Sequence, residues 1–312
     1  MSGSNPLVSV VIPTYDRTEV VRAVDSVRRQ TYEPIELIVV DDCSQTPAAD
    51  RLGRRDGVER FECIRHEENR GGNAARVTGI EAATGEYVAF LDDDDEWAPE
   101  KVERQVQALR SSAAAVAYTG VRNVDSERRT LSLRTRRVEG DVSERLLYGN
   151  FVGTFSCVMV SADAIRRIGF PDERLPCWQD WEYYLRLSED HEFVAIPEPL
   201  VIRHNASTGQ ISRSFVEKRE TAYPHLRGTI ERIAAPKGRL VRRKALAALD
   251  QQLGYAALAN GEYADARRYL LRSVARYPLR PKVYPYLLGA LGGKRVYPTL
   301  RRRKRALVDR LS

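Results

Sequence analysis

The sequence lacks both a long apolar run and a patterned set of cysteines. No apolar stretch among its 312 residues approaches the roughly 20 residues that a membrane-spanning helix needs. The N-terminus has no basic segment ahead of its short apolar run, which argues against a signal peptide. The scattered cysteines form no CxxC pair, which indicates reduced thiols rather than a disulfide scaffold or a zinc site. They are Cys43, Cys63, Cys157 and Cys177. We therefore expect a cytoplasmic protein, at most peripheral to the cytoplasmic membrane face.

Two common nucleotide-binding motifs are also missing. The first apolar run, residues 7–12, is not followed by GxGxxG, and the chain contains no GxxxxGK[ST] segment. The first absence weakens a dinucleotide-binding hypothesis, and the second argues against a phosphate-binding loop. With 43% hydrophobic residues, the chain is nevertheless long enough to bury one large core and to carry a smaller appendage.

The net charge changes sign along the chain. Residues 216–312 contain 23 Lys and Arg against 7 Asp and Glu, whereas residues 1–215 contain more acidic than basic residues. Such asymmetry suggests two parts with different partners. We expect one domain over residues 1–215 and a basic helical region over residues 216–312.

Strand-like and helix-like segments alternate through the first domain. The β-branched runs 7–12 and 35–40 are typical of strands buried on both faces, and apolar residues recur at helical spacing through 19–30. This alternation predicts an α/β fold with a mostly parallel sheet between helices and with ligands at the carboxyl ends of the strands. Further strands are expected at 60–65, 87–91, 115–121, 157–160, 194–196 and 200–203, and further helices at 73–83, 99–110, 162–168 and 178–187.

The segment AFLDDDDEW contains the strongest chemical signal. Four successive carboxylates, Asp92 to Asp95, follow the strand-like run 87–91. Like charges about 4 Å apart repel by roughly 4 kcal/mol at an effective dielectric near 20, so a cluster at the end of a buried strand favours a bound cation. Mg²⁺ and Mn²⁺ prefer oxygen ligands and commonly bind one or two carboxylates plus substrate phosphates. The alternative is an acidic loop that water simply solvates.

Two further residues follow strands at the same expected edge of the sheet. Tyr15 follows the first strand and can stack on a base, while Asp42 follows the second and can accept hydrogen bonds from a base or ribose. A metal on Asp92 and Asp94 can neutralise a diphosphate there. Together these residues predict a site for an activated nucleotide. Taken singly, Tyr15 can be a packing residue and Asp42 a turn residue.

Four segments, taken together, resemble the motifs of a known enzyme family. SVVIPTYDR, LIVVDDCSQ, ENRGGNAARVTGIEAATGEYVAFLDDDDEW and WQDWEYYLRL look like the successive motifs of family-2 inverting glycosyltransferases with a GT-A fold. The resemblance covers residues 7–205 in the family's order and spacing. It implies that residues 1–215 form a GT-A catalytic domain.

The resemblance also implies roles for individual residues. The family pattern LDxDDxW implies that Asp92 and Asp94 hold the divalent cation, Mn²⁺ or Mg²⁺. Asp180 is implied to be the catalytic base, although the chain has Gln179 where the family usually has Glu. The alternative for Asp180 is a helix N-cap carboxylate. Donor contacts are implied for Thr14, Tyr15, Asp42, Arg76 and Asp93.

His204 ends the last expected strand of this domain. Family members often carry a His here that reaches the metal or diphosphate, and imidazole suits Mn²⁺, so the resemblance implies a third metal ligand. A surface or loop His is the alternative. Trp178 and Trp181 flank Asp180 and can form a platform for an acceptor sugar or pack in the core.

The C-terminal region has its own pattern. LGYAALANGEYADARRYLLRSVARYP places small and apolar residues at the spacings of one tetratricopeptide repeat. A basic run follows at residues 301–305. The resemblance makes a lipid-linked acceptor natural, and an anionic membrane surface then suits the basic region. A protein partner for the repeat is the alternative, and no base-reading motif suggests a nucleic acid.

We therefore expect a metal-dependent inverting glycosyltransferase. It would move a sugar from a nucleotide-diphosphate sugar to a glycan or lipid-linked acceptor in cell-surface polysaccharide or glycoprotein assembly. A sugar nucleotidyltransferase is one competitor, but it should carry a Gly-rich loop and a Lys after the first strand, and PTYDRTEVV lacks both. A non-catalytic tetratricopeptide scaffold on a transferase-like fold is another, but it should have lost Asp92, Asp94 or Asp180.

Overall fold

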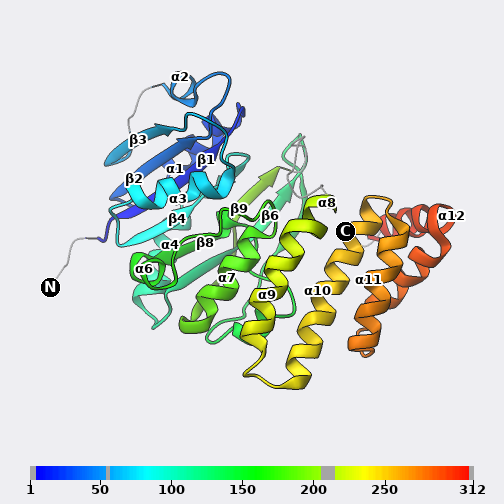
Figure 1. Cartoon of the computed structure of the whole chain (residues 1–312). Coiled ribbons are helices and arrows are strands. Elements are labelled where there is room, and N and C mark those ends of the chain that lie inside the picture. The colour runs from blue at the N-terminus through cyan, green and yellow to red at the C-terminus, as the bar shows by residue number, and fades with distance from the viewer. Residues whose placement is uncertain (1–4, 54–56, 205–214, 309–312) are drawn as a thin grey trace. The chain divides into compact units, whose positions relative to one another are not determined.

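The computed structural model describes residues 5–53, 57–204 and 215–308, without the side chains of residues 295, 296 and 298–308 (Figure 1). The chain divides into two compact units. The sheet unit comprises Met1–Ser143, Asn150–Arg174 and Gln179–Gly209, and the helical unit comprises Glu144–Gly149, Leu175–Trp178 and Gln210–Ser312.

Nine strands of the described chain form one mixed sheet in the sheet unit, in the order β3-β2-β1-β4-β8-β6-β9-β5, with β7 paired to β6. The strands are β1 (Val8–Thr14), β2 (Ile35–Asp41), β3 (Arg60–Arg65), β4 (Tyr87–Phe90), β5 (Asp95–Trp97), β6 (Val116–Val124), β7 (Thr130–Arg134), β8 (Val158–Ser161) and β9 (Phe193–His204). The helices of this unit are α1 (Val20–Arg28), α2 (Ala48–Leu52), α3 (Gly72–Ala82), α4 (Lys101–Arg110), α6 (Ala162–Ile168) and α7 (Gln179–Asp190).

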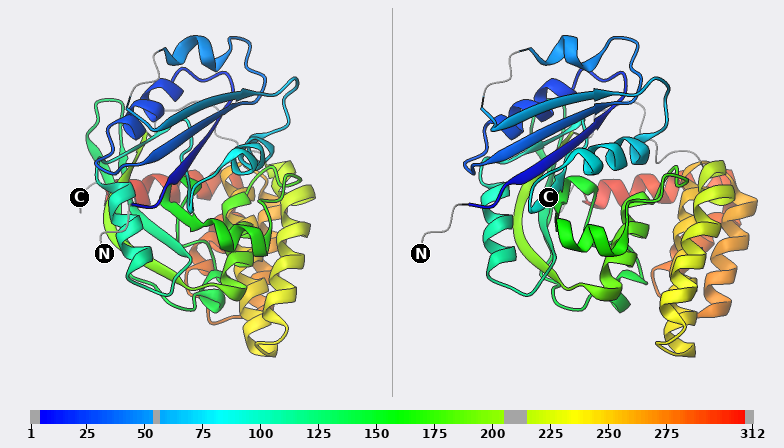
Figure 2. Two further views of the ribbon diagram at one scale, coloured as in Figure 1. Left: turned by 90° about the vertical axis from the view of Figure 1, so that its left-hand side faces the viewer. Right: turned by 60° about the vertical axis from the view of Figure 1, so that its left-hand side comes forward.

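The strand order changes direction at β1, so the carboxyl end of β1 is where a ligand is expected. From β1 the chain moves to β2 on one side and later returns to β4 on the other, with both pairings parallel. The helices α1 and α3 consequently lie on opposite faces of these strands (Figure 2). Because both faces are covered, every residue of β1, β2 and β4 is buried. Such a switch in strand order is where open α/β sheets bind ligands.

The predicted α/β fold is confirmed, and the structure adds detail to the expected sheet. Parallel pairing joins β3, β2, β1 and β4, and also β6 and β9, whereas β8 is antiparallel to both of its neighbours. The strands expected at 194–196 and 200–203 are one strand, β9. Its register against β6 shifts at Gly120, where an added Cβ would lie 2.9 Å from the Glu198 carbonyl oxygen. Two prolines beside Glu198 remove ladder donors, which explains why the sequence pattern breaks there.

The strand β5 was not expected from the sequence. Its residues Asp95 to Trp97 belong to the segment AFLDDDDEW, in which a strand was expected only up to residue 91. They pair antiparallel with β9, with Asp95 opposite Arg203 and Trp97 opposite Val201. Acidic residues are depleted in strands, so local propensity hides this element. The partner strand, which is distant in sequence, supplies both the ladder and the compensating charge.

All regular elements of the helical unit, within the residues described, are helices. They are α5 (Ser143–Leu146, whose first residue belongs to the sheet unit), α8 (Phe215–Glu217), a π-helical turn (Lys218–Ala222), α9 (Tyr223–Ala234), α10 (Arg239–Ala259), α11 (Tyr263–Arg276) and α12 (Val283–Val308). The expected tetratricopeptide-like segment forms α10, a turn at Gly261 with φ +80°, and α11. None of the helices in the described ranges has the length and apolarity required to cross a bilayer.

The packing of α10 on α11 depends on Gly254. An added Cβ at this position would lie 2.7 Å from Leu270 Cγ, which is fully buried. We expect Gly254→Ala to lower the free energy of unfolding by about 1–3 kcal/mol, because the core must shift to admit a methyl group. The matched variant Gly228→Ala, where nothing lies within 4 Å, should instead raise it by about 0.5–1 kcal/mol through helix propensity. Urea denaturation measures both, and a Gly254→Ala protein as stable as Gly228→Ala would contradict this packing.

Candidate active site

The acidic segment starts where β4 ends, beside the end of β1. The backbone N–H of Leu91 donates to the Val11 carbonyl over 3.0 Å, which continues the parallel pairing to the edge of the acidic run. The hydroxyl of Thr14, at the end of β1, donates to Asp93 Oδ2 over 2.8 Å, and both residues are buried. Two of the predicted donor-binding residues are thus joined directly.

Three arginines surround the exposed side of the segment. Arg76 Nη2 lies 2.6 Å from Asp92 Oδ1, and Arg17 Nη1 lies 3.3 Å from Asp94 Oδ2. Arg22 Nη2 donates to the carbonyl oxygen of Asp94 over 2.9 Å. The repulsion expected among adjacent carboxylates is therefore offset by cations of the chain itself. Of the three, only Arg76 was predicted to belong to the site.

Burial distinguishes the four carboxyl groups from one another. It raises the pKa of Asp93 to about 7, against the opposing effects of a hydrogen bond and a nearby guanidinium. Burial also raises the pKa of Asp95 well above its ordinary value, and the negative charges of Asp92 and Asp94 add to this. The side chains of Asp92 and Asp94 are 25% and 22% exposed. They are the two carboxylates that a ligand can reach.

Arg76 links the acidic segment to the start of α7. Besides Asp92, its guanidinium contacts Asn73 Oδ1 at 3.2 Å and Gln179 Oε1 at 3.3 Å, and it lies over the Phe155 ring at 4.4 Å from the centroid. These contacts fix a nearly buried cation between the candidate metal ligands and the candidate base. The side chain is therefore positioned by groups from several elements before any ligand binds.

Asp180 is half-buried near the N-terminus of α7. Its Oδ2 accepts a hydrogen bond from Asn150 Nδ2 over 3.0 Å, and its Oδ1 accepts one from the Trp181 backbone N–H over 2.7 Å. Burial raises its pKa to about 6; the Trp181 hydrogen bond opposes this rise, whereas the negative charge of Asp92 adds to it. A carboxylate with a pKa in this range can take up a proton near neutral pH.

Asp42 and Tyr15 lie at the neighbouring strand ends. Asp42 Oδ1 lies 2.8 Å from His66 Nδ1 and accepts from the Arg70 N–H over 2.8 Å, while its Oδ2 accepts from the Gly71 N–H over 2.7 Å. A carboxylate has about four acceptor positions, so one remains for a ligand. Tyr15 is 48% exposed at the end of β1, and its ring is therefore accessible.

His204 lies at the end of β9, next to a different carboxylate from those predicted to bind metal. Its Nε2 is 2.6 Å from Glu96 Oε1, and Glu96 also contacts Arg22 at 3.2 Å and Arg128 at 2.8 Å. The hydrogen bonds from Arg128 and His204 hold the pKa of Glu96 below its ordinary value despite burial, which acts in the opposite direction. The structure does not bring His204 together with Asp92 and Asp94.

The donor set around Asp92 and Asp94 suits a cation that is shared with a substrate. Among residues 5–53, 57–204 and 215–308, no group of three or more His, Cys, Asp and Glu is arranged to hold a metal. Two accessible carboxylates of hard oxygen character are nevertheless the usual protein share of a Mg²⁺ or Mn²⁺ site that substrate phosphates complete. The residues present therefore fit such a cation, with Asp92 and Asp94 as its protein ligands.

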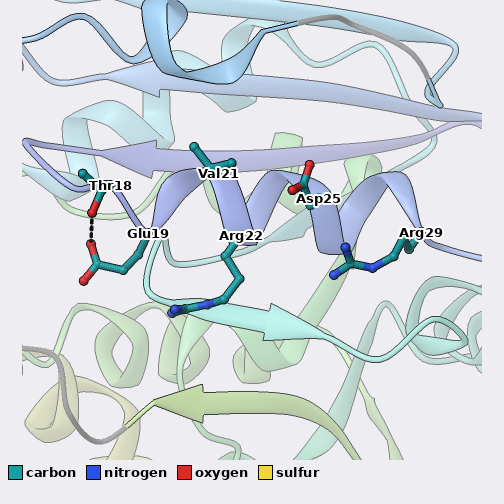
Figure 3. A pocket seen from close by; sticks show the side chains of 6 residues that line it. All are labelled: Thr18, Glu19, Val21, Arg22, Asp25 and Arg29. Carbon is teal, nitrogen blue, oxygen red and sulfur yellow. Dashed lines mark hydrogen bonds between the residues drawn. The ribbon is translucent and has the colours of Figure 1, made fainter. Parts of the chain in front are cut away.

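A hollow of about 360 Å³ lies along α1, close to this region (Figure 3). Its lining comes from α1, from the two residues before it, Thr18 and Glu19, and from Arg29 directly after it. Arg22 lines it too, but its guanidinium is directed to Asp94 and Glu96. Because one short segment supplies every lining group, we assign no ligand to this hollow.

Comparison with known proteins identifies the family. The sequence pattern described as Glycosyl transferase family 2 matches residues 9–169, which is slightly more than half of the chain and includes the acidic segment. The chain belongs to glycosyltransferase family 2. The match ends before Asp180 and His204 and therefore does not cover the motif WQDWEYYLRL that contains Asp180.

Two relatives of this family 2 glycosyltransferase match more than half of the chain. The putative teichuronic acid biosynthesis glycosyltransferase TuaG of Bacillus subtilis is 32% identical over 56% of this chain and 69% of that protein. The putative colanic acid biosynthesis glycosyl transferase WcaA of Escherichia coli is 30% identical over 71% of this chain and 80% of that protein. The chain is thus a glycosyltransferase.

A solved structure shares the fold. The structure of S. aureus TarS residues 1–349 in complex with UDP-GlcNAc aligns with a TM-score of 0.57 at 15% identity, over 86% of this chain and 89% of that one. At this identity the likeness concerns the fold alone. It agrees with the GT-A architecture predicted from the sequence.

Several supporting residues were not found from the sequence. Arg17 lies before α1 and Arg22 on α1, where the sequence pattern indicates only the apolar face of a helix. Asn150 lies in an irregular segment and Ser156 in a 3₁₀ turn (Phe155–Cys157), and neither belongs to a motif. Ser156 Oγ nevertheless donates to Asp95 Oδ2 over 2.7 Å and accepts from the Asp92 N–H over 3.0 Å. The sequence signal that indicates them is the pair of arginines in DRTEVVR. This pair follows the first strand, at the same expected edge of the sheet as the acidic segment.

Proposed function

We propose that the enzyme is an inverting, divalent-cation-dependent glycosyltransferase that transfers a sugar from a nucleotide-diphosphate sugar to a glycan or lipid-linked acceptor. The observation that carries the proposal is that three carboxylates near one another differ in exposure and environment. Two accessible ones, Asp92 and Asp94, lie at the end of β4, while a third, Asp180, is half-buried and lies within electrostatic reach of Asp92. The first pair suits a diphosphate with its cation, and the third suits a proton acceptor.

The proposed chemistry needs one base and a stabilised leaving group. Asp180 takes the proton from the acceptor hydroxyl as that oxygen attacks the anomeric carbon from the face opposite the nucleoside diphosphate. When bound, the divalent cation supplies Lewis-acid stabilisation of the charge on the leaving diphosphate. Arg76 holds Asp92 and keeps a positive charge beside the reacting centre. Inversion follows because a single displacement leaves no covalent intermediate on the protein.

The remaining predicted residues would recognise the nucleotide. Tyr15 offers an exposed ring for stacking on the base, and the free acceptor position on Asp42 suits a base or ribose donor. Thr14 acts through Asp93, which it orients by a hydrogen bond. His204 is bonded through Nε2 to Glu96 and so supports the β5–β9 edge, and the metal contact predicted for it would use Nδ1.

The names of the relatives support a role in cell-surface polysaccharide assembly. TuaG and WcaA are named for teichuronic and colanic acid biosynthesis, and TarS is described with UDP-GlcNAc. We extend to this chain the class of donor, a nucleotide-diphosphate sugar, and the class of process. The cytoplasm, where such donors are made, is the proposed location.

The function can be tested with a panel of nucleotide-diphosphate sugars. Thermal unfolding with and without Mn²⁺ should show one donor that stabilises the protein only with the cation, because ligands that bind the native state raise its stability by mass action. Release of the nucleoside diphosphate with an acceptor glycan then identifies glycosyl transfer. Release of pyrophosphate from a nucleoside triphosphate and a sugar 1-phosphate, with no transfer from the nucleotide sugars, would instead indicate a nucleotidyltransferase. Donor binding without any release would indicate a non-catalytic scaffold.

The pH dependence of the reaction tests the role of Asp180. Because the base must be ionised, kcat/KM should rise about tenfold per pH unit below the pKa of about 6 and become level above it. The rise lies at higher pH than an ordinary Asp would give, since burial favours the protonated form. Initial rates between pH 4.5 and 8, in buffers of equal ionic strength, measure this. A profile already level at pH 5 would argue against Asp180 as the base.

We further propose that residues 1–215 are the catalytic domain and that the basic region, residues 216–312, holds it at an anionic membrane. Tyr284, Leu288 and Leu291 are exposed on one face of α12, at helical spacings of four and three residues. The sequence from 283 to 293 contains no charged residue, and seven Lys and Arg without any acidic residue follow between 294 and 305. An apolar face next to a basic stretch is typical of helices that bind membrane surfaces.

Co-sedimentation with anionic liposomes tests this membrane contact. Deleting residues 299–312 should weaken binding at low salt, and about 0.5 M salt should weaken binding of the full chain because it screens the lipid charge. Leu288→Glu should also weaken binding, whereas Leu133→Glu, at an exposed position on β7 of the sheet unit, should not. Equal and salt-insensitive sedimentation of all these proteins would contradict the membrane role and leave the transferase assignment intact.

A further inference from the structure

The helical unit contains a basic hollow that the proposed transfer reaction does not use. It has a volume of about 290 Å³ and is formed by side chains from three helices. Its arginines are Arg227 of α9, Arg239, Arg242 and Arg243 of α10, and Arg276 of α11. The buried Leu246 and the carboxylate of Glu231 complete the lining. Residues nearly 50 positions apart in the sequence thus bring five arginine side chains to the lining of one hollow.

The carboxylates nearby neutralise only part of this charge. Glu231 Oε1 lies 3.1 Å from Arg227 Nη2 and 3.4 Å from Arg242 Nη2, so one carboxylate serves two guanidinium groups. The second carboxylate is the buried Asp250, whose Oδ2 lies 2.8 Å from Arg276 Nε. Two acidic groups therefore face five arginines.

The other two arginines keep their charge uncompensated. Arg243 Nε donates over 2.9 Å to the carbonyl oxygen of Arg276, which is an acceptor without formal charge. Arg239 is exposed at the first position of α10 and has no hydrogen bond or ion pair with the residues that the structure describes. Positive side chains that line one hollow repel one another, and a bound anion reduces this repulsion.

We propose that this hollow binds a phosphate or diphosphate group carried by a ligand other than the sugar donor. Arginine matches phosphate oxygens through paired N–H groups, and several guanidinium groups around one concave site suit a multiply charged anion. The volume is small for a drug-sized ligand but sufficient for an anionic head, with the rest of its molecule outside. The proposal goes beyond the transfer reaction, because none of these residues belongs to the acidic segment or to α7.

Titration of the full chain with pyrophosphate tests the proposal. The solution contains a chelator at low salt, so that cation-assisted binding at Asp92 and Asp94 does not contribute. Calorimetry should show binding that weakens about tenfold or more in Arg239→Ala and in Arg242→Ala, since each removes charge-assisted hydrogen bonds. Arg268→Ala removes one exposed arginine from α11 outside the hollow and should bind as the wild type does. Thermal unfolding of each variant without ligand establishes that it is folded. If Arg242→Ala is unstable, Arg239→Ala still tests the proposal, because the Arg239 side chain makes no hydrogen bond or ion pair with the described residues that the variant would lose.

A second set of measurements identifies the source of the phosphate. Phosphatidylcholine vesicles with and without phosphatidic acid report a lipid headgroup, while pyrophosphate reports a soluble phosphorylated ligand. Binding in either arm that requires Arg239 but not Arg268 supports the proposal and names the source. Absence of binding by the wild-type protein in both arms overturns it. Equal weakening by Arg268→Ala and Arg239→Ala also overturns it, because diffuse surface charge would then explain the binding.

Discussion

The Asp180→Asn variant should bind the nucleotide-sugar donor like the wild type but transfer sugar at least ~10²-fold more slowly, as expected when a general base is lost. The replacement keeps the size of the side chain and removes its ability to accept a proton. Donor affinity should be preserved because the proposed donor contacts come from the ends of β1, β2 and β4 and from Arg76 on α3, not from Asp180. Single-turnover transfer rates, together with donor titration, separate the two effects.

The structure supplies a close control for this experiment. Glu182, two residues further along α7, is buried and holds Arg186 Nε at 3.0 Å and 3.1 Å with its two oxygens. Glu182→Gln should therefore keep nearly normal turnover per folded molecule. The reverse result, a slow Glu182→Gln and an active Asp180→Asn, would move the base to Glu182. The pH profile of whichever variant remains active then shows whether the limb near pH 6 has disappeared.

Much of the fold could be predicted because local pattern and tertiary environment agree in its central strands. The strand expected at 60–65 and the helix expected at 162–168 have the observed limits of β3 and α6. The continuous β-branched runs of β1 and β2 occur where both faces are covered, so their hydrophobicity reports burial directly. By contrast, β7 is a mostly exposed strand of TLSLR, which pairs at the edge of β6 and has little burial to mark it.

The candidate site was predictable to the extent that it depends on strand ends. Thr14 and Asp93, and likewise Arg76 and Asp92, were proposed as site residues separately, and the structure joins each pair by a direct contact. What the sequence could not indicate is the partner of each charge. Glu96 lies beside His204, 108 positions away, only because β5 pairs with β9, and that pairing is itself hidden in an acidic segment.

The second large effect is expected for Asp94→Ala. Asp94 Oδ2 lies 3.3 Å from Arg17 Nη1, and the Asp94 side chain is 22% exposed. Losing this ion pair should therefore change the free energy of unfolding by no more than about 1 kcal/mol. Donor binding should lose most of its dependence on Mn²⁺ or Mg²⁺, and turnover should fall by ~10²-fold or more, because the cation supplies several kcal/mol of charge stabilisation. Donor titrations with and without cation measure the first effect, and initial rates measure the second.

Two outcomes of the Asp94→Ala experiment have opposite meanings. If the variant unfolds at a much lower temperature and its donor affinity keeps the wild-type cation dependence, the acidic run serves the fold and the proposed metal role is wrong. If stability is preserved and cation dependence is lost, Asp94 is a ligand. Asp163→Ala provides the reference, since this carboxylate is 80% exposed, pairs with Arg166 and lies on α6, away from the proposed cation ligands. It should leave donor affinity, cation dependence and turnover unchanged, so that any loss in Asp94→Ala reflects its position beside Asp92 rather than the removal of one negative charge from the protein.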